Sequence, residues 1–254
     1  KTTIVHASVV HLLIEFLVSV CDQSPKIVRK FKGARSEKNY FAIKLFPLCI
    51  QMMCKIKDDL TWDSSTTPEE ESEDGDDDES GAVSNDWDIG ETALDRACQS
   101  LGLRSTYVLV SAQLIGLFSS PSWKEQYSGL RYLGNYVEIS KNFTEKKQLA
   151  QHRTEVLSVV IQFSRKQHYR VRAAAYYALN QFLLMHGSSI NFGTKSKQSS
   201  SVEHHNMIMN LVLPNVISGM AKKENPPPRV RRFVVACLIN LIDCCIPASM
   251  LDST

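Results

Sequence analysis

We predict that this chain of 254 residues is an all-α protein made of repeated pairs of helices. Apolar residues recur at the helical period, and no stretch alternates convincingly between apolar and polar residues as a strand would. The stretches that start at His168 and Pro226 share an Arg-Val-Arg opening followed by the same apolar face. Such internal repetition of helices is typical of a HEAT-repeat (armadillo-like) α-solenoid.

The repeated helices have partners along the chain. A third copy opens at Pro121 and Trp123, and each of the three copies follows another apolar helix candidate. These partners lie at roughly 105–118, 150–165 and 203–221. A helix, a short turn and a second helix, recurring at about 40–50 residues, is the arrangement of a HEAT unit.

Residues 1–56 are predicted to hold the end of one repeat and the first helix of the next, at 41–56. The apolar start is long enough to suggest a membrane span, but it contains His6, His11 and Glu15. A carboxylate buried in lipid is costly, so we expect no membrane insertion. The chain begins with Lys inside a helical pattern, which favours a piece of a longer protein.

Residues 57–89 interrupt this repeat with an acidic loop. Fourteen acids and no Lys or Arg lie between Asp58 and Asp88. The loop has too few apolar residues to offset the entropy lost on ordering, so we expect it to be disordered when unbound. Trp62 and Trp87 bracket it and can pack when its ends become fixed. Outside it, 29 basic residues face 13 acidic ones, a charge of about +16.

The remaining chain is assigned to repeats and one insertion. We predict HEAT repeats over 90–186, a flexible insertion at 187–201 and a further HEAT repeat over 202–254. The insertion is rich in Gly, Ser and Lys, which suits a loop. It also explains why the step from Val171 to Val230 is 59 residues, longer than one HEAT unit.

No motif in the sequence predicts catalysis or metal binding. The seven cysteines lie in apolar stretches without metal-ligand spacing, which favours reduced core residues of an intracellular protein. The neighbours His204 and His205, like Cys244 and Cys245, would point about 100° apart on a helix, which does not suit a shared metal. No activated nucleophile or phosphate loop is recognisable. We expect no enzyme activity, no cofactor and no metal.

Several segments, in the same order, resemble the importin beta-3 (karyopherin beta-3, importin-5) branch of the importin-β superfamily. The match runs from about Leu17 to Leu251 and includes SPKIVRK, LFPLCIQMMCKIKDD before a Trp and an acid run, ETALDRACQSLG, SSPSWKEQYSGLRYL, HYRVRAAAYYALNQ and ACLINLIDCC. The resemblance implies a nuclear import receptor that shuttles between cytoplasm and nucleus. Such receptors bind cargo localisation signals on a concave HEAT face, release them on Ran-GTP binding and touch Phe-Gly repeats of the nuclear pore.

The resemblance also implies which residues bind cargo. Asp95, Glu138, Asn240 and Asp243 match family positions on second helices that face the concave groove, and Met185 stands where the family has Asp. Acid and amide oxygens can accept hydrogen bonds from a cargo lysine, which offers three donors. One exposed ion pair contributes about 0–1 kcal/mol, so tight binding of cargo needs several such residues. For each residue alone, ordinary surface polarity is the open alternative.

The acidic loop is implied to contact Ran-GTP or cargo through Glu73, Asp74, Asp76, Asp77, Asp78 and Glu79. A dense run of carboxylates can hold a basic surface by screened attraction. The alternative is that the loop folds back as a shield over the basic body of this chain.

Four arginines, at 170, 172, 229 and 231, start second helices. We expect them to pair with acids of the next repeat, with phosphate contact as the alternative. The rival to nuclear import is therefore a HEAT scaffold without a transport role, which could bind nucleic acid through its basic body.

Overall fold

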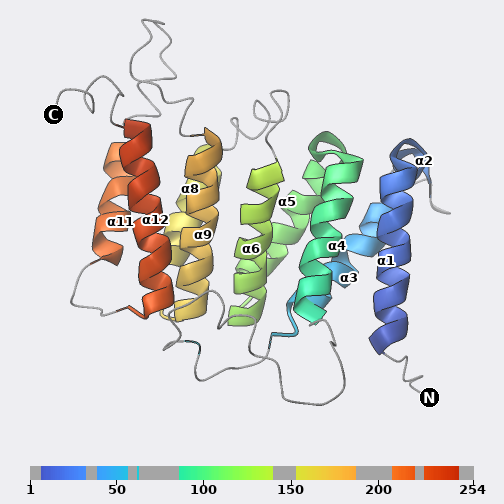
Figure 1. The fold of residues 1–254 in the computed structure, drawn as a ribbon, viewed down its shortest axis with the longest axis horizontal. Coiled ribbons are helices and arrows are strands. Elements are labelled where there is room, and N and C mark those ends of the chain that lie inside the picture. The colour runs from blue at the N-terminus through green and yellow to red at the C-terminus, as the bar shows by residue number, and fades with distance from the viewer. Residues whose placement is uncertain are drawn as a thin grey trace, which may run out of the picture. The chain divides into compact units, whose positions relative to one another are not determined.

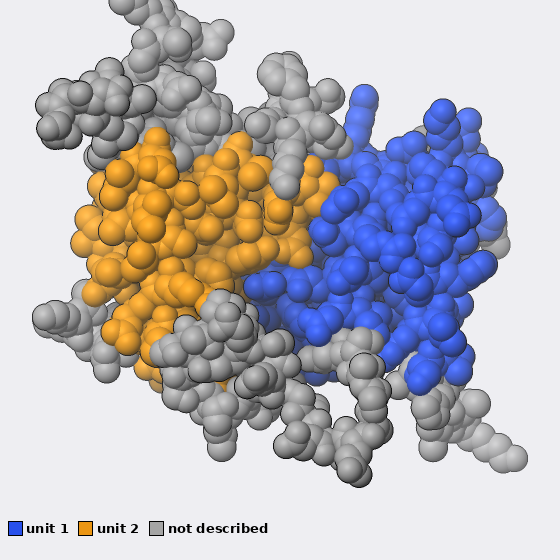
Figure 2. All heavy atoms as spheres, viewed as in Figure 1, with its two compact units in different colours: residues 1–58, 77–132 blue, residues 59–76, 133–254 orange. Residues whose placement is uncertain are grey.

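The structure, a computed structural model, describes most of the predicted helices. The described residues are 7–32, 39–56, 62, 86–139, 153–186, 208–220 and 226–245. Every regular element within these ranges is a helix (Figure 1). The chain divides into two compact units, shown in different colours in Figure 2. Unit 1 comprises residues 1–58 and 77–132, and unit 2 comprises residues 59–76 and 133–254.

Unit 1 is built around one helix pair that the acidic segment interrupts. Its helices are α1 (Ala7–Gln23), α2 (Pro25–Lys30), α3 (Tyr40–Met53), α4 (Asp86–Leu101), α5 (Leu103–Ser119) and the first part of α6 (Trp123–Ile139). Helix α4 packs most extensively against α3 and also contacts α1. Helices α3 and α4 cover most of the stretches 41–56 and 90–102, and their assignment to one repeat stays a prediction.

The α3–α4 contact is close because the residues that face each other are small or apolar. Phe46, Cys49 and Met53 of α3 are fully buried, as is Ala97 of α4. At Gly90 the two backbones approach so closely that an added Cβ would lie 2.5 Å from the carbonyl oxygen of Cys49. Glycine allows this approach because it has no Cβ.

Helix α4 begins at Asp86, inside the range predicted as acidic loop. Asp86 and Asp88 occupy the first helical turn, where the positive end of the helix dipole stabilises carboxylates. Between them, the ring of Trp87 packs against Tyr127 of α6, with 5.3 Å between ring centroids. The count of acids predicts a loop here, whereas in this position the carboxylate of Asp86 supports a helix start.

Unit 2 repeats the paired arrangement. Its helices are the end of α6, α8 (Arg153–Ser164), α9 (Tyr169–His186), the π-helical turn η3 (Ile208–Val212), α11 (Leu213–Gly219) and α12 (Pro228–Cys245). Figure 1 shows α9 and α12 side by side, in front of α8 and α11. The apolar faces predicted around Val171 and Val230 form the core between α9 and α12, where both residues are fully buried.

The helix predicted at 203–221 is divided in the described part. A π-helical turn ends at Val212 and α11 begins at Leu213, with Pro214 at its first turn. Proline has no N–H to donate and is favoured at the start of a helix, so Pro214 explains the new beginning.

Two predicted segments fall mainly outside the described residues. The insertion 187–201 lies entirely outside them, and of the acidic loop only Trp62 and residues 86–89 are described. None of the described helices has the length and apolar character needed to cross a membrane.

Candidate functional site

Asp95, the first of the predicted cargo-binding residues, lies in the middle of α4 and is partly exposed. Its carboxylate accepts a hydrogen bond of 3.0 Å from Nε2 of Gln99, one turn further along the helix. The adjacent Arg96 bonds to Glu15 at 2.8 Å and to Asp22 at 2.7 Å, and so ties α4 to α1. Asp95 therefore belongs to a charged surface formed by second helices in unit 1.

A second ion pair joins α4 to the first part of α6. Arg131 donates to Glu91 through both Nε, at 3.2 Å, and Nη2, at 3.1 Å. Burial raises the pKa of the neighbouring Asp88, and the charge of Glu91 raises it further. Acidic and basic side chains are thus interleaved along this side of unit 1.

The other predicted cargo-binding residues lie in unit 2. Glu138 is partly exposed in the last turn of α6, and Asp243 is exposed near the end of α12. Asn240 of α12 donates a hydrogen bond of 2.5 Å to Oδ1 of Asn180 on α9. Met185, the residue at the position of the missing acid, is partly exposed on α9. The structure thus joins Asn240 to Asn180, a residue that the sequence does not assign to the site.

Amide and hydroxyl groups link the second helices of unit 2. Besides the Asn180–Asn240 bond, the hydroxyl of Tyr177 donates to Oδ1 of Asn135 on α6 at 2.8 Å. Sequence reasoning missed these partners of the predicted site. The available signal was the register, since Asn180 and Asn240 stand at nearly the same place after the two Arg-Val-Arg openings.

Arginines at the starts of α9 and α12 lie over the ring of Trp62. Trp62, only 8% exposed, lies with its ring centroid 5.4 Å from the guanidinium carbon of Arg170 and 5.2 Å from that of Arg229. Arg170 and Arg229 are themselves 8% and 4% exposed. The sequence predicts acids as partners of these arginines, and this stays a prediction; the aromatic contact is an addition that the sequence does not indicate. Arg172 is also buried, over the ring of Tyr169 at 5.7 Å.

The six acids assigned to Ran or cargo contact, Glu73, Asp74, Asp76, Asp77, Asp78 and Glu79, lie outside the described residues. The C-terminal end of their segment is described at Asp86, which Nζ of Lys55 contacts at 2.8 Å and Nε2 of His11 at 2.5 Å. The hydrogen bond from Lys55 lowers the pKa of Asp86, and the contact with His11 lowers it further. The segment therefore enters α4 through a carboxylate held by basic side chains.

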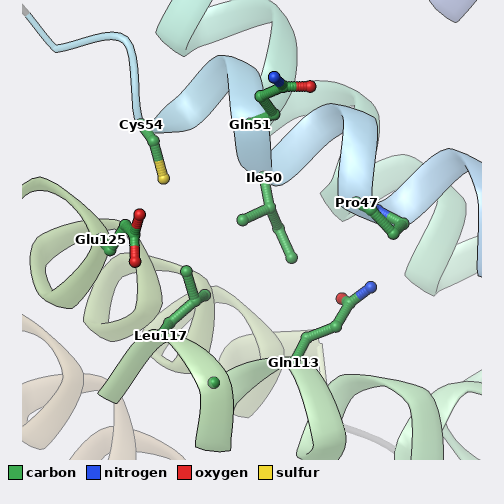
Figure 3. A pocket seen from close by; sticks show the side chains of 8 residues that line it. Pro47, Ile50, Gln51, Cys54, Gln113, Leu117 and Glu125 are labelled. Atoms are coloured by element: carbon green, nitrogen blue, oxygen red, sulfur yellow. The ribbon is translucent and has the colours of Figure 1, made fainter. Parts of the chain in front are cut away.

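A hollow of about 360 Å³ lies on unit 1 between α3 and α5. It is lined by Pro47, Ile50, Gln51, Cys54, Gln113, Gly116, Leu117 and Glu125. Figure 3 shows the side chain of Ile50 from α3 and that of Leu117 from α5 pointing into the space between the two helices, with Gln113 beside them. Most of its surface is apolar, so it suits an apolar or aromatic side chain more than a charged group.

Cys21, Cys49, Cys98 and Cys237 are buried in the core. Burial raises the pKa of Cys21 to about 11 and the pKa values of Cys49 and Cys98 to about 12. Thiols with such values are weak nucleophiles and weak metal ligands at neutral pH. Among the described residues, no group of three or more His, Cys, Asp and Glu side chains could hold a metal ion.

Comparison with known proteins identifies the repeat and the fold. Residues 5–107 match the family model of the importin repeat. The structure of Kap121p bound to RanGTP matches with a TM-score of 0.65 and 18% identity, over 95% of this chain and 20% of that one. Kap121p bound to the extreme C-terminus of the protein phosphatase Cdc14p matches with 0.65 and 19% identity, over 91% and 19%. Kap121p bound to Nup53p matches with 0.63 and 19% identity, over the same shares.

These matches confirm the predicted all-α solenoid fold, and the importin repeat confirms the resemblance to importins that the sequence suggested. The importin beta-3 branch stays a prediction. The chain spans about a fifth of the length of the solved structures that it matches.

Proposed function

We propose that this chain, which carries an importin repeat and has the fold of a karyopherin, is part of a nuclear import receptor. The observation that carries the proposal is the likeness of nearly the whole chain to Kap121p, which has been seen bound to RanGTP and to the proteins Nup53p and Ste12p. A receptor of this kind acts by binding and release without catalysis, and it shuttles between cytoplasm and nucleus.

Cargo lysines are proposed to bind along the second helices. Asp95, Glu138 and Asp243 are exposed or partly exposed on α4, α6 and α12, so an ammonium group of a cargo can approach each of them from the solvent. Asn240 adds an amide that is already oriented by its bond to Asn180. Because each exposed pair contributes only about 0–1 kcal/mol, the proposal requires several lysines or polar groups of one peptide to bind together.

The hollow on unit 1 is the proposed site for a phenylalanine of a Phe-Gly repeat. An aromatic ring would bury its faces against Ile50 and Leu117, and burial of apolar surface would stabilise the contact. Gln51 and Gln113 at the edge offer amide groups that can bond to the main chain beside the phenylalanine.

The acidic segment, with Glu73, Asp74 and Asp76–Glu79, is proposed to contact Ran-GTP or cargo. A run of fourteen acids between Asp58 and Asp88 provides a strong negative field that a basic partner surface would neutralise. Such a contact would weaken as salt increases, since exposed charges are screened.

Nucleotide-dependent binding of Ran separates this proposal from the rival scaffold. Immobilised chain is titrated with Ran-GTP and, as the matched control, with Ran-GDP, and a labelled single-stranded RNA is titrated in parallel. A transport receptor binds Ran-GTP more tightly than Ran-GDP, and RNA weakly. Binding of RNA with a steep salt dependence, together with equal or absent binding of the two forms of Ran, would support the nucleic-acid-binding scaffold instead.

A further inference from the structure

The hydrogen bond between Asn180 and Asn240 in unit 2 leaves a donor and an acceptor within reach of solvent. Asn240 of α12 donates through Nδ2 to Oδ1 of Asn180 on α9, over 2.5 Å. This bond uses neither Nδ2 of Asn180 nor Oδ1 of Asn240. Both side chains are partly exposed, and neither of these two atoms is among the buried polar atoms without a partner in the described part of the chain. A ligand can therefore reach both groups.

Contacts around α9 hold this pair of asparagines in place. Tyr177, which lies three residues before Asn180, donates its hydroxyl to Oδ1 of Asn135 on α6 at 2.8 Å. Its ring also packs against that of Phe233 on α12, with the centroids 6.0 Å apart and the planes at 80°. Residues three apart on a helix lie on one face, so the aromatic contact sets the spacing of α9 and α12 beside Asn180. Because the two amides are oriented in advance, less conformational entropy is lost when a ligand binds.

A donor beside an acceptor matches the main chain of an extended peptide. In an antiparallel sheet, one residue of a strand bonds to its neighbour through both its N–H and its C=O. A lysine ammonium has three donors and no acceptor, so it can use the oxygen of Asn240 but not the nitrogen of Asn180. The exposed carboxylate of Asp243, three residues after Asn240, suits a lysine better. The peptide main chain is therefore the ligand that satisfies both asparagines.

We propose that the Asn180–Asn240 pair binds the main chain of one residue of the cargo peptide, with Asn240 accepting its N–H and Asn180 donating to its C=O. The inference rests on the proposed function, because it requires a lysine-bearing peptide along α9 and α12. It adds a rule of specificity that does not involve the lysines. One position of the peptide must be extended and cannot be proline, since proline has no N–H.

Ester substitution in the peptide tests the main-chain contact. A fluorescein-labelled peptide with several unevenly spaced lysines is made in a series of forms, each with one main-chain N–H replaced by an ester oxygen. Each form is titrated with the chain and followed by fluorescence anisotropy. At one position the ester should weaken binding to the wild type about three- to tenfold, as the loss of one hydrogen bond allows. In Asn240→Ala, which lacks the accepting oxygen, the same ester should no longer weaken binding.

Asn180→Ala tests the donor of the pair. It should weaken binding of the unmodified peptide about three- to tenfold, because the peptide C=O loses its partner and Asn240 loses its orientation. Gln162→Ala is the matched control, since it removes a neutral amide from an exposed position on α8, and it should bind as the wild type does. Circular dichroism of each variant checks that the helices are intact.

The outcomes separate the inference from the proposed function. If the wild type binds the peptide and every ester has the same effect in the wild type and in Asn240→Ala, the main-chain contact is refuted while the proposed function stands. If Asn240→Ala instead abolishes the effect of replacing one lysine by norleucine, the amide binds lysine and the inference is wrong. If the wild type does not bind the peptide, both fail. Should a variant not fold, the ester series on the wild type decides, and equal affinities for all its forms would overturn the inference.

Discussion

At Gly90 the backbones of α3 and α4 lie so close together that adding one methyl group should push the helices apart. In Gly90→Ala the new Cβ would lie 2.5 Å from the carbonyl oxygen of Cys49, 3.0 Å from Cβ of Met52 and 3.1 Å from Cγ of Met53. Real Cβ atoms essentially never come within 3.0 Å of another heavy atom, and the first of these neighbours is backbone. Helix α4 must therefore move away from α3.

The expected cost follows from two opposing effects. Overpacking in a well-packed core costs about 1–3 kcal/mol. Alanine in place of glycine inside a helix regains about 0.5–1 kcal/mol. We therefore expect Gly90→Ala to lower the free energy of unfolding by about 1–2 kcal/mol.

Gly116→Ala is the matched control, because it makes the same chemical change in the interior of α5, where a new Cβ meets nothing within 4 Å. It should raise the free energy of unfolding by about 0.5–1 kcal/mol. Urea unfolding of both variants, followed by helical circular dichroism and by tryptophan fluorescence, measures the difference. If Gly90→Ala stabilises the protein as much as Gly116→Ala does, α3 and α4 are not packed as described.

Three further predictions concern charge and the proposed binding surfaces. Asp86→Asn should lower stability at pH 7 by about 0.5–1 kcal/mol, because the folded-state pKa of Asp86 is lowered. The loss of stability should vanish as the pH falls through the lowered pKa of Asp86. Asp88→Asn removes a carboxylate with a raised pKa, so it should instead stabilise the protein at pH 7. Urea unfolding between pH 3 and pH 7 distinguishes the two variants, and equal effects would contradict the assignment. Gly116→Phe should fill the hollow on unit 1 and reduce the affinity for a Phe-Gly peptide in calorimetry. Gly116→Ala should leave that affinity nearly unchanged. An unaltered affinity in Gly116→Phe would exclude this hollow as the site. Met185→Asp should tighten a lysine-bearing signal peptide up to about five-fold, as one added exposed ion pair allows, and the isosteric Met185→Leu should not.

The helix pairs could be predicted because their signal is local. Val171 and Val230 each start an apolar face with helical spacing, and both are fully buried where that spacing places them. The sequence does not reveal that position 90 must be glycine. The constraint comes from the packing of α3 against it, and α3 lies more than thirty positions earlier in the chain.

The features that sequence reasoning missed depend on distant partners or on competing local signals. Nothing in the sequence near Trp62 indicates that two arginines more than one hundred positions away lie over its ring. At Asp86 the density of acids predicts a loop, although the carboxylate of Asp86 suits the first turn of α4 and contacts Lys55. The candidate site was predicted as single residues, and the bond between Asn180 and Asn240 emerges only when α9 and α12 are packed together.

The central claim, that the second helices bind lysine-bearing localisation signals, is tested most directly by titrating one labelled signal peptide into two forms of the chain. The first is the wild type, and the second carries Asp95→Ala, Glu138→Ala, Asn240→Ala and Asp243→Ala together. With about 0.5 kcal/mol of binding free energy from each of the four residues, the substitutions should weaken binding roughly thirty-fold without loss of helicity. A control with Glu155→Ala, which removes an exposed acid from the first helix α8, should bind as the wild type does. Equal affinities for the wild type and the fourfold variant would contradict the account.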